Sequence, residues 1–318
     1  MVGTPPSLGK QPSIDQNPQG GGPDNMTSKE VSMLIFGLGW TSNYLVPKLN
    51  KEKISYAGTT TTGRDGSYKF KFSYDPALDP SSSSSEDLEQ YRVLPTAETL
   101  LITFPIKGKE AIKYFLDSYQ KTHDKKNDYH VILLGSTGIW SIEGQEQWVT
   151  RHSKYDTKDA RAEVEDWLTE RGGCALNLSG LWGGERNVKH WIDRVASSKE
   201  QLKTKNSLHM IHGEDVARAI IAVHGQWNDG KGSRWMLTDM VVYDWWELIL
   251  GFGGELDSQN QNDERARKQL KWVGELMREN DVRALPRSME QLGRCYDTRE
   301  FWKTFGLMPT RARLSSVP

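Results

Sequence analysis

The sequence contains little cysteine and no long hydrophobic run. Its two cysteines in 318 residues, Cys174 and Cys295, are too few for a disulfide framework, which is typical of a chain in a reducing compartment. No apolar stretch is long enough to span a bilayer, and the first residues lack the hydrophobic core of a signal peptide. These absences predict a cytoplasmic protein that has no membrane partner.

An excess of charge of one sign is also lacking. The chain has 41 Lys and Arg residues against 42 Asp and Glu residues, which gives a formal net charge of −1. This balance provides no bulk attraction to nucleic acid, so nucleic acid is not a predicted partner. His209 and His212 lie three residues apart without carboxylates at ligand spacing, and the sequence predicts no metal site.

Large apolar residues are scarce in residues 1–29, which are rich in Pro, Gly, Gln, Asn and Ser. Such a segment cannot bury enough surface to offset the entropy lost on ordering, so we expect a disordered N-terminal tail. Residues 309–318 are expected to form a loose tail. Residues 30–308 are long enough to bury a sizeable core.

What the sequence does contain is a βαβ pattern near its start. A short hydrophobic strand, residues 31–36, runs into a turn with two glycines, residues 37–42. A helical segment through Leu45 and Leu49 then leads to a second strand, residues 54–60. Glycines at a strand-to-helix turn of this kind are typical of a dinucleotide-binding site.

Each glycine of that turn has a physical role. Gly37 can adopt backbone angles closed to other residues, and Gly39, which lacks a Cβ, lets the main chain approach a pyrophosphate at the helix N-terminus. The third position of the fingerprint is Ser42 rather than glycine, and a simple tight turn is the alternative interpretation. The dinucleotide hypothesis predicts cofactor contacts from Gly37, Leu38, Gly39, Trp40, Thr41 and Ser42.

The end of the second strand bears on which nucleotide binds. An acidic residue there would bind the ribose hydroxyls of NAD, whereas an arginine accommodates the 2′-phosphate of NADP. Thr60 and Arg64 favour NADP, while Asp65 keeps NAD as the alternative. Arg64 could equally be a solvated loop charge.

Further strands alternate with helices along the chain. Residues 69–74, 99–104 and 128–134 read as the third, fourth and fifth strands. This alternation predicts an α/β fold with a parallel sheet, whose ligand crevice lies at the carboxyl ends of the strands. Phe104 and Pro105, at the end of the fourth strand, would then lie beside the cofactor.

Three more motifs follow the glycine turn in a recognisable order: Gly135-Ser136-Thr137-Gly138, then Gly180-Leu181-Trp182-Gly183-Gly184, then Ile211-His212-Gly213-Glu214-Asp215-Val216-Ala217. In this order they resemble the extended and atypical short-chain dehydrogenase/reductases, the NAD(P)-dependent epimerase/dehydratase group, and in particular a fungal branch of that group. The resemblance implies a Rossmann-type doubly wound parallel sheet with a small C-terminal substrate lobe. It implies that this lobe is drawn mainly from residues 183–210 and 235–308, and that Leu181 lies beside the nicotinamide.

The resemblance also implies catalytic residues. Ser136, or less favourably Thr137, takes the position of the serine that hydrogen-bonds the reacting oxygen. The family then uses a tyrosine as general acid/base and a lysine four residues later on the same helical face. The corresponding helix, which we expect to be capped by Asp156, is predicted to bury Ala160, Val164, Trp167 and Leu168.

Neither register of that helix supplies the tyrosine and lysine. Matching the buried stripe places Thr157 and Arg161 at these positions. Thr157 has no accessible pKa, whereas Arg161 is permanently charged and could still bind the ribose or a phosphate. A shift of two residues recovers Tyr155 but puts Asp159 at the lysine position. Tyr155 is the first candidate for proton donor if it turns inward. The alternative interpretation is that Tyr155 is a surface aromatic residue and that Arg161 is an exposed charge on the helix.

These observations lead to three hypotheses about function. The first is an NADP-preferring oxidoreductase or epimerase/dehydratase-like enzyme that acts on a small carbonyl or hydroxyl compound, which Arg186 and His190 are candidates to contact. The second is a non-catalytic NAD(P)-binding protein that reports redox state, and the missing dyad favours it. The third is a non-redox isomerase or lyase on the same fold. Family members often pair through helices that flank the sheet, which allows a homodimer.

Overall fold

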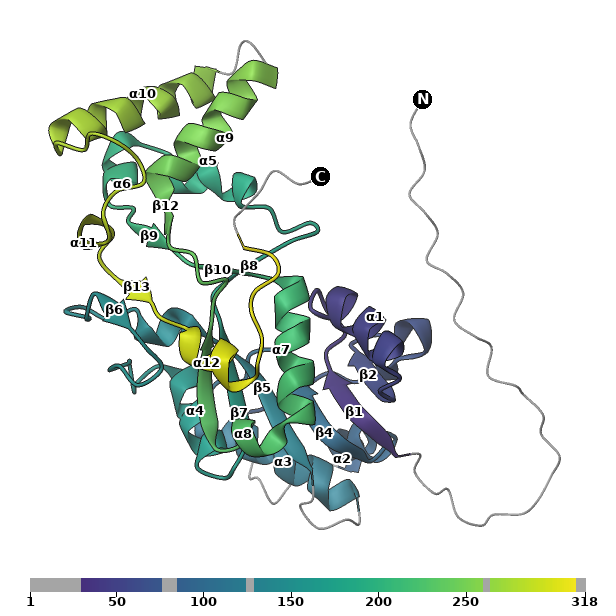
Figure 1. The fold of residues 1–318 in the computed structure, drawn as a ribbon. Coiled ribbons are helices and arrows are strands. Elements are labelled where there is room, and N and C mark those ends of the chain that lie inside the picture. Colours follow the sequence, from purple (N-terminus) through teal and green to yellow (C-terminus); the bar gives the residue numbers. More distant parts are fainter. Residues whose placement is uncertain (1–29, 76–84, 124–128, 260–263, 313–318) are drawn as a thin grey trace, which may run out of the picture.

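A single parallel sheet organises the structure, a computed structural model that describes residues 30–75, 85–123, 129–259 and 264–312 (Figure 1). The predicted disordered tail, residues 1–29, lies outside this part of the chain. The sheet has seven strands in the order β3-β2-β1-β4-β5-β7-β11, and every neighbouring pair is parallel. The strands are β1 (Val31–Phe36), β2 (Tyr56–Thr60), β3 (Tyr68–Lys69), β4 (Ala97–Ile102), β5 (His130–Ser136), β7 (Cys174–Leu178) and β11 (Ser233–Leu237). This order confirms the predicted Rossmann-type parallel sheet.

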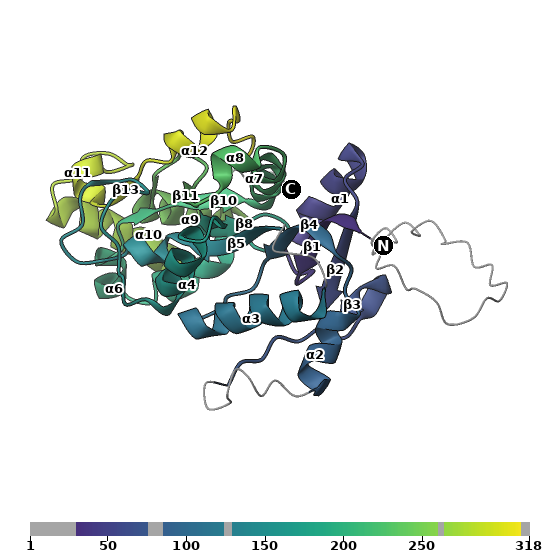
Figure 2. The ribbon, with the colours of Figure 1, turned by 90° about the horizontal axis from the view of Figure 1, so that it is seen from below.

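Helices cover both faces of the sheet, as Figure 2 shows from below. One face carries α1 (Ser42–Glu52), α7 (Gly213–Gly225) and α12 (Arg299–Thr304), and the other carries α2 (Ser85–Arg92), α3 (Lys109–Thr122) and α4 (Ala160–Thr169). Because alternate strand residues point to opposite faces, Met33 and Ile35 enter the first core, whereas Leu34 and Phe36 enter the second. Burial on both faces explains why β1 reads as a continuous apolar run.

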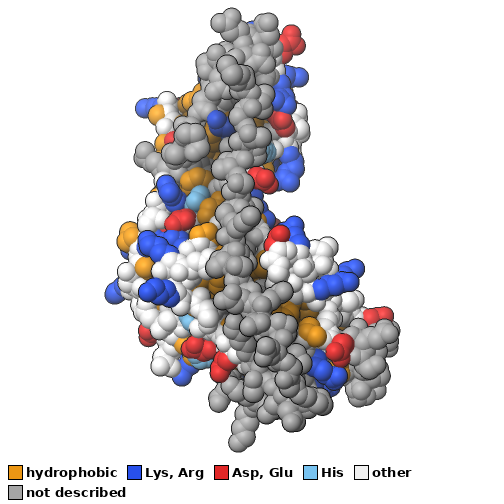
Figure 3. Space-filling model, turned by 90° about the vertical axis from the view of Figure 1, so that its right-hand side faces the viewer, with side chains coloured by type: hydrophobic (Ala, Val, Ile, Leu, Met, Phe, Trp, Pro, Cys, Tyr) orange, Lys and Arg blue, Asp and Glu red, His pale blue; other side chains and the backbone are white. Residues whose placement is uncertain are grey.

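A smaller lobe stands beyond the carboxyl ends of the strands. It contains α5 (Ile192–Val195), α6 (Lys199–Lys203), α9 (Trp245–Gln259), α10 (Glu264–Glu279) and α11 (Met289–Leu292). Its own core includes Leu202, Trp246 and Val273, and a buried ion pair of 2.7 Å joins Arg287 to Asp244. In Figure 3 the outline of the molecule narrows between this lobe, at the top, and the part that holds the sheet.

Short elements connect the two parts. Three two-stranded pairs are β8 (Gly180–Trp182) with β10 (Met210–His212), β9 (Ser207–Leu208) with β12 (Tyr243–Asp244), and β6 (Trp148–Val149) with β13 (Cys295–Tyr296). Further short helices in the described residues are η1 (Arg64–Gly66), η3 (Thr137–Trp140), η4 (Val188–Trp191) and α8 (Trp227–Gly230). None of the helices in the described part of the chain is both long enough and apolar enough to cross a membrane.

Two local predictions are wrong. Of the expected third strand, residues 69–74, only Lys69 lies in a strand, β3, and beyond it the rings of Phe70 and Phe72 pack against Phe115 of α3. The expected cap Asp156 accepts a bond from the N–H of Lys158, outside the helix. The cap of α4 is Asp159, so the helix begins at Ala160.

The segment after residue 308 is anchored at its start. The carboxylate of Asp215, which is fully buried in the first turn of α7, accepts hydrogen bonds from the backbone N–H groups of Thr310 (3.0 Å) and Arg311 (2.9 Å). It also pairs with Arg218 at 2.7 Å. The predicted loose tail is therefore corrected for Thr310 and Arg311, while residues 313–318 lie outside the described residues.

Candidate functional site

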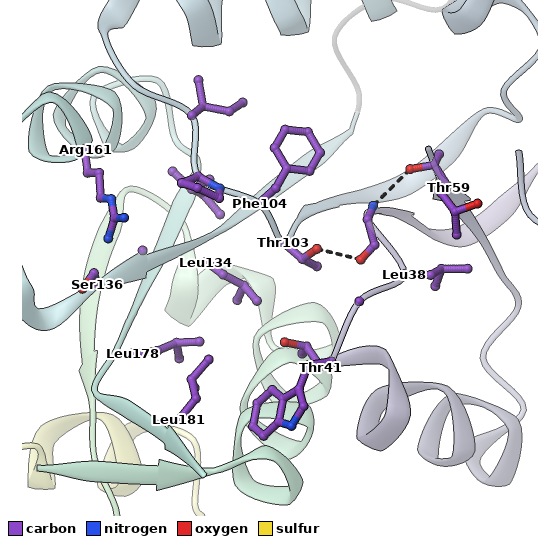
Figure 4. A pocket seen from close by; sticks show the side chains of 18 of the residues that line it. Leu38, Thr41, Thr59, Thr103, Phe104, Leu134, Ser136, Arg161, Leu178 and Leu181 are labelled. Atoms are coloured by element: carbon purple, nitrogen blue, oxygen red, sulfur yellow. Dashed lines mark hydrogen bonds between the residues drawn. The ribbon is translucent and has the colours of Figure 1, made fainter. Parts of the chain in front are cut away.

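A cavity of about 650 Å³ opens at the carboxyl ends of β1, β2, β4, β5 and β7 (Figure 4). This is the crevice where ligands bind in doubly wound sheets. Apart from Ser42, every predicted cofactor residue lines this cavity, and of the predicted catalytic residues Ser136 and Arg161 do so. Around the cavity, as elsewhere in the described residues, no group of three or more His, Cys, Asp or Glu side chains could hold a metal ion.

The glycine turn is held by two threonine side chains. The backbone N–H of Gly37 donates to Thr59 Oγ1 (3.0 Å), and the hydroxyl of Thr103 donates to the carbonyl oxygen of Gly37 (2.7 Å). Gly37 has φ +99°, and a Cβ there would lie 2.6 Å from Thr103 Oγ1, so only glycine fits. A Cβ on Gly39 would meet no atom within 4 Å, which means that Gly39 faces open space.

The start of α1 presents two N–H groups beside this turn. Among the hydrogen bonds of the described residues, the backbone N–H groups of Trp40 and Thr41 donate none, whereas that of Ser42 donates to the carbonyl of Gly39 (3.0 Å). The first two are available to an anion such as a pyrophosphate. Ser42 is buried below the turn and does not line the cavity, so its predicted cofactor contact is not supported.

Trp40 connects the glycine turn to the loop that follows β8. Its indole N–H donates to the carbonyl oxygen of Gly183 (3.1 Å), and the guanidinium of Arg186 lies 4.4 Å over its ring. Arg186, a candidate substrate contact in the sequence, therefore lies at the glycine-turn end of the cavity. His190, the other candidate, is not among the cavity-lining residues.

The loop after β2 forms the end of the cavity that lies beyond the glycine turn, on the side away from β5. Thr60 Oγ1 accepts hydrogen bonds from the N–H groups of Gly63 (2.9 Å) and Arg64 (3.2 Å), which fixes the turn that carries Arg64. The Arg64 side chain lines the cavity yet is 67% exposed, and its Nε lies 3.9 Å from Asp65. Asp65, at 90% exposed, does not line the cavity. A cation at this position suits a phosphate better than a neutral ribose.

Apolar side chains line the end of the cavity near β5. Phe104 and Pro105 follow β4, and Leu181 belongs to β8. They are joined there by Leu134 and Leu178 (Figure 4). Such a surface fits the uncharged ring of a reduced nicotinamide.

Ser136 and Arg161 both line the cavity at this end. Ser136 ends β5, and its Oγ accepts a hydrogen bond of 3.1 Å from the N–H of Gly138. Arg161 lies in the first turn of α4, and its side chain points into the cavity toward Ser136 (Figure 4). Thr157 precedes α4, is exposed and does not line the cavity, so the structure does not bring it to Ser136.

Tyr155 is held away from the cavity. Its hydroxyl donates to Asp166 Oδ1 (2.7 Å), and the guanidinium of Arg234 lies 4.3 Å over its ring. Burial raises the pKa of the phenol. The prediction that Tyr155 turns inward is not supported by this arrangement, and among the described residues no tyrosine lines the cavity.

Glu165 is a cavity residue that the sequence analysis missed. Its carboxylate is fully buried, accepts a bond from Asn177 Nδ2 (2.9 Å) and pairs with Arg234 Nε (2.7 Å). Burial raises the pKa of this carboxyl group. The available signal was its spacing, because Glu165 lies four residues after Arg161 and so on the same face of α4.

Comparison with known proteins identifies the fold. No family model and no curated protein matches the chain. Among solved structures, yeast methylglyoxal/isovaleraldehyde reductase Gre2 with NADPH is 15% identical over 88% of this chain and 94% of its own, with a TM-score of 0.53.

Two bacterial structures are similar in the same way. A short-chain dehydrogenase/reductase superfamily protein from Agrobacterium tumefaciens with bound NAD is 10% identical over 80% of this chain and 100% of its own, with a TM-score of 0.51. A Methylobacillus flagellatus protein assigned to the NAD-dependent epimerases/dehydratases is 18% identical over 86% and 91%, with a TM-score of 0.50. The chain therefore has the Rossmann-like fold of the NAD(P)-dependent epimerase/dehydratase and extended short-chain dehydrogenase/reductase structures, as its motif order predicts.

Proposed function

We propose that the cavity binds NADP(H) and that the chain is an oxidoreductase or epimerase/dehydratase-like enzyme acting on a small carbonyl or hydroxyl compound. The observation that carries the proposal is the glycine turn. Thr59 and Thr103 fix it so that the N–H groups of Trp40 and Thr41 are left for a pyrophosphate. Gre2 was solved with NADPH and the Agrobacterium protein with NAD, so the fold accommodates both nucleotides.

The order of residues along the cavity gives the nucleotide a direction. Arg64, after β2, would bind the 2′-phosphate of the adenosine half, and Arg186 would bind the pyrophosphate beside Trp40. The apolar end by Phe104 then receives the nicotinamide, with Ser136 next to it. When bound, the cofactor supplies hydride chemistry, while the chain orients it and polarises the substrate oxygen through Ser136.

A second candidate function is a non-catalytic NAD(P)-binding protein that reports redox state. The position of Tyr155 favours it, because its hydroxyl is bonded to Asp166 and the cavity has no phenol beside Ser136 within the described residues. In this case NADPH binds but no carbonyl compound oxidises it. Transfer of a labelled hydride from NADPH to a substrate would show that the protein is an enzyme and not a non-catalytic sensor. It would also favour a redox reaction over a lyase reaction.

The test of the cofactor site is calorimetric titration with NADPH and NADH. We expect Arg64→Ala to weaken NADPH binding by about 10- to 100-fold, the usual worth of a hydrogen bond to a charged group, and to leave NADH binding unchanged. Arg92→Ala is the matched control, because Arg92 is an exposed arginine of α2 outside the cavity. If neither nucleotide binds the unaltered chain, the glycine turn is only architecture and the proposal is wrong.

A further inference from the structure

The cavity carries one cation that the proposed cofactor contacts leave unused. Its charged lining residues in the described part of the chain are Arg64, Arg161, Arg186 and Glu165. Arg64 lies at the adenosine end and Arg186 at the glycine turn, so each is placed for a phosphate of the nucleotide. Arg161 is at the other end, where the guanidinium points toward Ser136 (Figure 4).

No carboxylate in the described part of the chain forms an ion pair with this guanidinium. The one acid in the cavity lining, Glu165, pairs with Arg234 at 2.7 Å, and Arg234 also pairs with Asp166 at 2.9 Å. Asp159 accepts a bond only from the backbone N–H of Arg161, at 2.7 Å. Among the ion pairs of the described residues Arg161 has none, so the donors of its guanidinium are available to a ligand.

The helix that carries Arg161 is fixed beside the end of β5 by buried contacts one helical turn away. Asn177 donates both to Glu165 and to the carbonyl oxygen of Ser136, each at 2.9 Å. Gly135 makes room for this contact, because a Cβ at this position would clash with the Glu165 carboxylate. These contacts pack α4 against the end of β5, and Arg161, four residues before Glu165, is thereby held at the same strand end.

We propose that Arg161 binds a carboxylate of the substrate, and that the carbonyl or hydroxyl oxygen on the neighbouring carbon meets Ser136. This names the substrate class of the proposed enzyme, a 2-oxo acid or the corresponding 2-hydroxy acid, and rests on the proposed function. A guanidinium matches a carboxylate in shape and can bind it through two parallel hydrogen bonds. One cation balances one negative charge, and the lining at this end includes the apolar Leu134 and Leu178, so the rest of the substrate would be uncharged.

The test uses two pairs of compounds that differ only in the carboxylate: 2-oxobutanoate with butanone, and phenylpyruvate with 1-phenylpropan-2-one. Each compound is titrated by calorimetry into the full chain, with and without saturating NADP⁺. We expect at least one acid to bind about tenfold or more tightly than its methyl ketone. Arg161→Ala should abolish that difference, Arg161→Lys should keep part of it, and Arg92→Ala should keep all of it.

The outcomes separate this inference from the proposed function. Equal binding of acid and ketone, or no binding of either acid in any condition, overturns it. A loss of NADPH affinity in Arg161→Ala with acid binding unchanged also overturns it, because Arg161 would then serve the cofactor. If NADPH does not bind but an acid binds the nucleotide-free chain through Arg161, the inference stands and the cofactor proposal fails.

Discussion

The hydroxyl of Thr103, just after β4, donates a hydrogen bond of 2.7 Å to the carbonyl oxygen of Gly37, just after β1. The same hydroxyl lies 3.0 Å from the carbonyl oxygen of Phe36. Two neighbouring strands are thus tied at the point where the nucleotide is proposed to bind. The shape of the glycine turn depends on a residue 66 positions away.

Replacing this threonine should loosen the turn. We expect Thr103→Val to lower the free energy of unfolding by about 0.5–1.5 kcal/mol and to weaken NADPH binding, because the hydroxyl tie is lost while each carbonyl keeps one backbone donor, the N–H of Gly39 or of Thr103. Thr122→Val is the control, since the Thr122 hydroxyl bonds to carbonyls within α3 and to the adjacent His123, all away from the cavity. Chemical denaturation and calorimetry measure both effects. Unchanged NADPH affinity in Thr103→Val would show that the tie is not needed for binding.

The pair formed by Glu165 and Arg234 gives a second prediction. Arg234→Met should cost about 3–5 kcal/mol of stability, because it leaves the fully buried Glu165 carboxylate without its cation. Adding Glu165→Gln should restore part of this loss, since the amide oxygen can still accept from Asn177 and carries no charge. Denaturant midpoints of the single and double variants test the coupling. A double variant no more stable than Arg234→Met would contradict the charge argument.

The contact between Tyr155 and Asp166 predicts a structural role for this phenol. Tyr155→Phe should lower stability by about 1 kcal/mol through the lost hydrogen bond, and should leave NADPH affinity and any turnover unchanged. Tyr119→Phe is the control, because its hydroxyl donates to the carbonyl of Pro95, which precedes β4 and lies outside the cavity. A fall in turnover of about 100-fold in Tyr155→Phe alone would instead identify it as the general acid.

The buried carboxyl of Asp239 predicts a dependence of stability on pH. Burial raises the pKa of Asp239 to about 7, and the phenol of Tyr243 donates to it. Between about pH 4 and 7 the folded chain therefore keeps a proton that the unfolded chain has lost. Stability should fall as the pH rises through this window, by about 1.4 kcal/mol per pH unit for a full proton. Asp239→Asn should remove this slope.

His209 acts in the opposite direction. Burial lowers its pKa to about 3, and its Nε2 accepts a hydrogen bond of 3.1 Å from the N–H of Tyr296. The unfolded chain then gains a proton below about pH 6.5 that the folded chain refuses, so stability should fall as the pH falls from about 6.5 to 3. The two slopes oppose each other between about pH 4 and 6.5. We expect denaturation of His209→Gln at several pH values to show only the loss of stability with rising pH that Asp239 causes. Identical pH profiles for the unaltered chain, Asp239→Asn and His209→Gln would rule out both assignments.

Local patterns in the sequence were enough to predict the sheet and one end of the site. The strand 31–36, the glycine turn and the position of Arg64 follow from neighbouring residues, and the structure places them together. The side-chain arrangement at the other end, near β5, depends on partners that are distant in the sequence. Tyr155 is turned toward Asp166 with Arg234, which comes from β11, stacked on its ring.

The start of α4 shows a different reason for error. Asp156 and Asp159 are both suitable caps by sequence, and their competition cannot be resolved from residue type alone. Because Asp159 is the cap, Thr157 stays outside the helix, and Arg161 with Glu165 occupies the face that the tyrosine and lysine were expected to share. Glu165 was overlooked because a single carboxylate on a helix is normally interpreted as a surface charge. Its partners in the fold, Asn177 and Arg234, cannot be identified from the sequence.

The hydrogen bonds that Asp215 accepts from Thr310 and Arg311 set a limit on how far the chain can be shortened. Removal of these residues would withdraw backbone donors from a carboxylate that has no access to water at the start of α7. Because α7 packs against α1, the helix that follows the glycine turn, the damage would extend to the nucleotide end of the cavity. A truncated chain for crystallisation should therefore keep Arg311, even though the neighbouring cavity contains no residue from this segment.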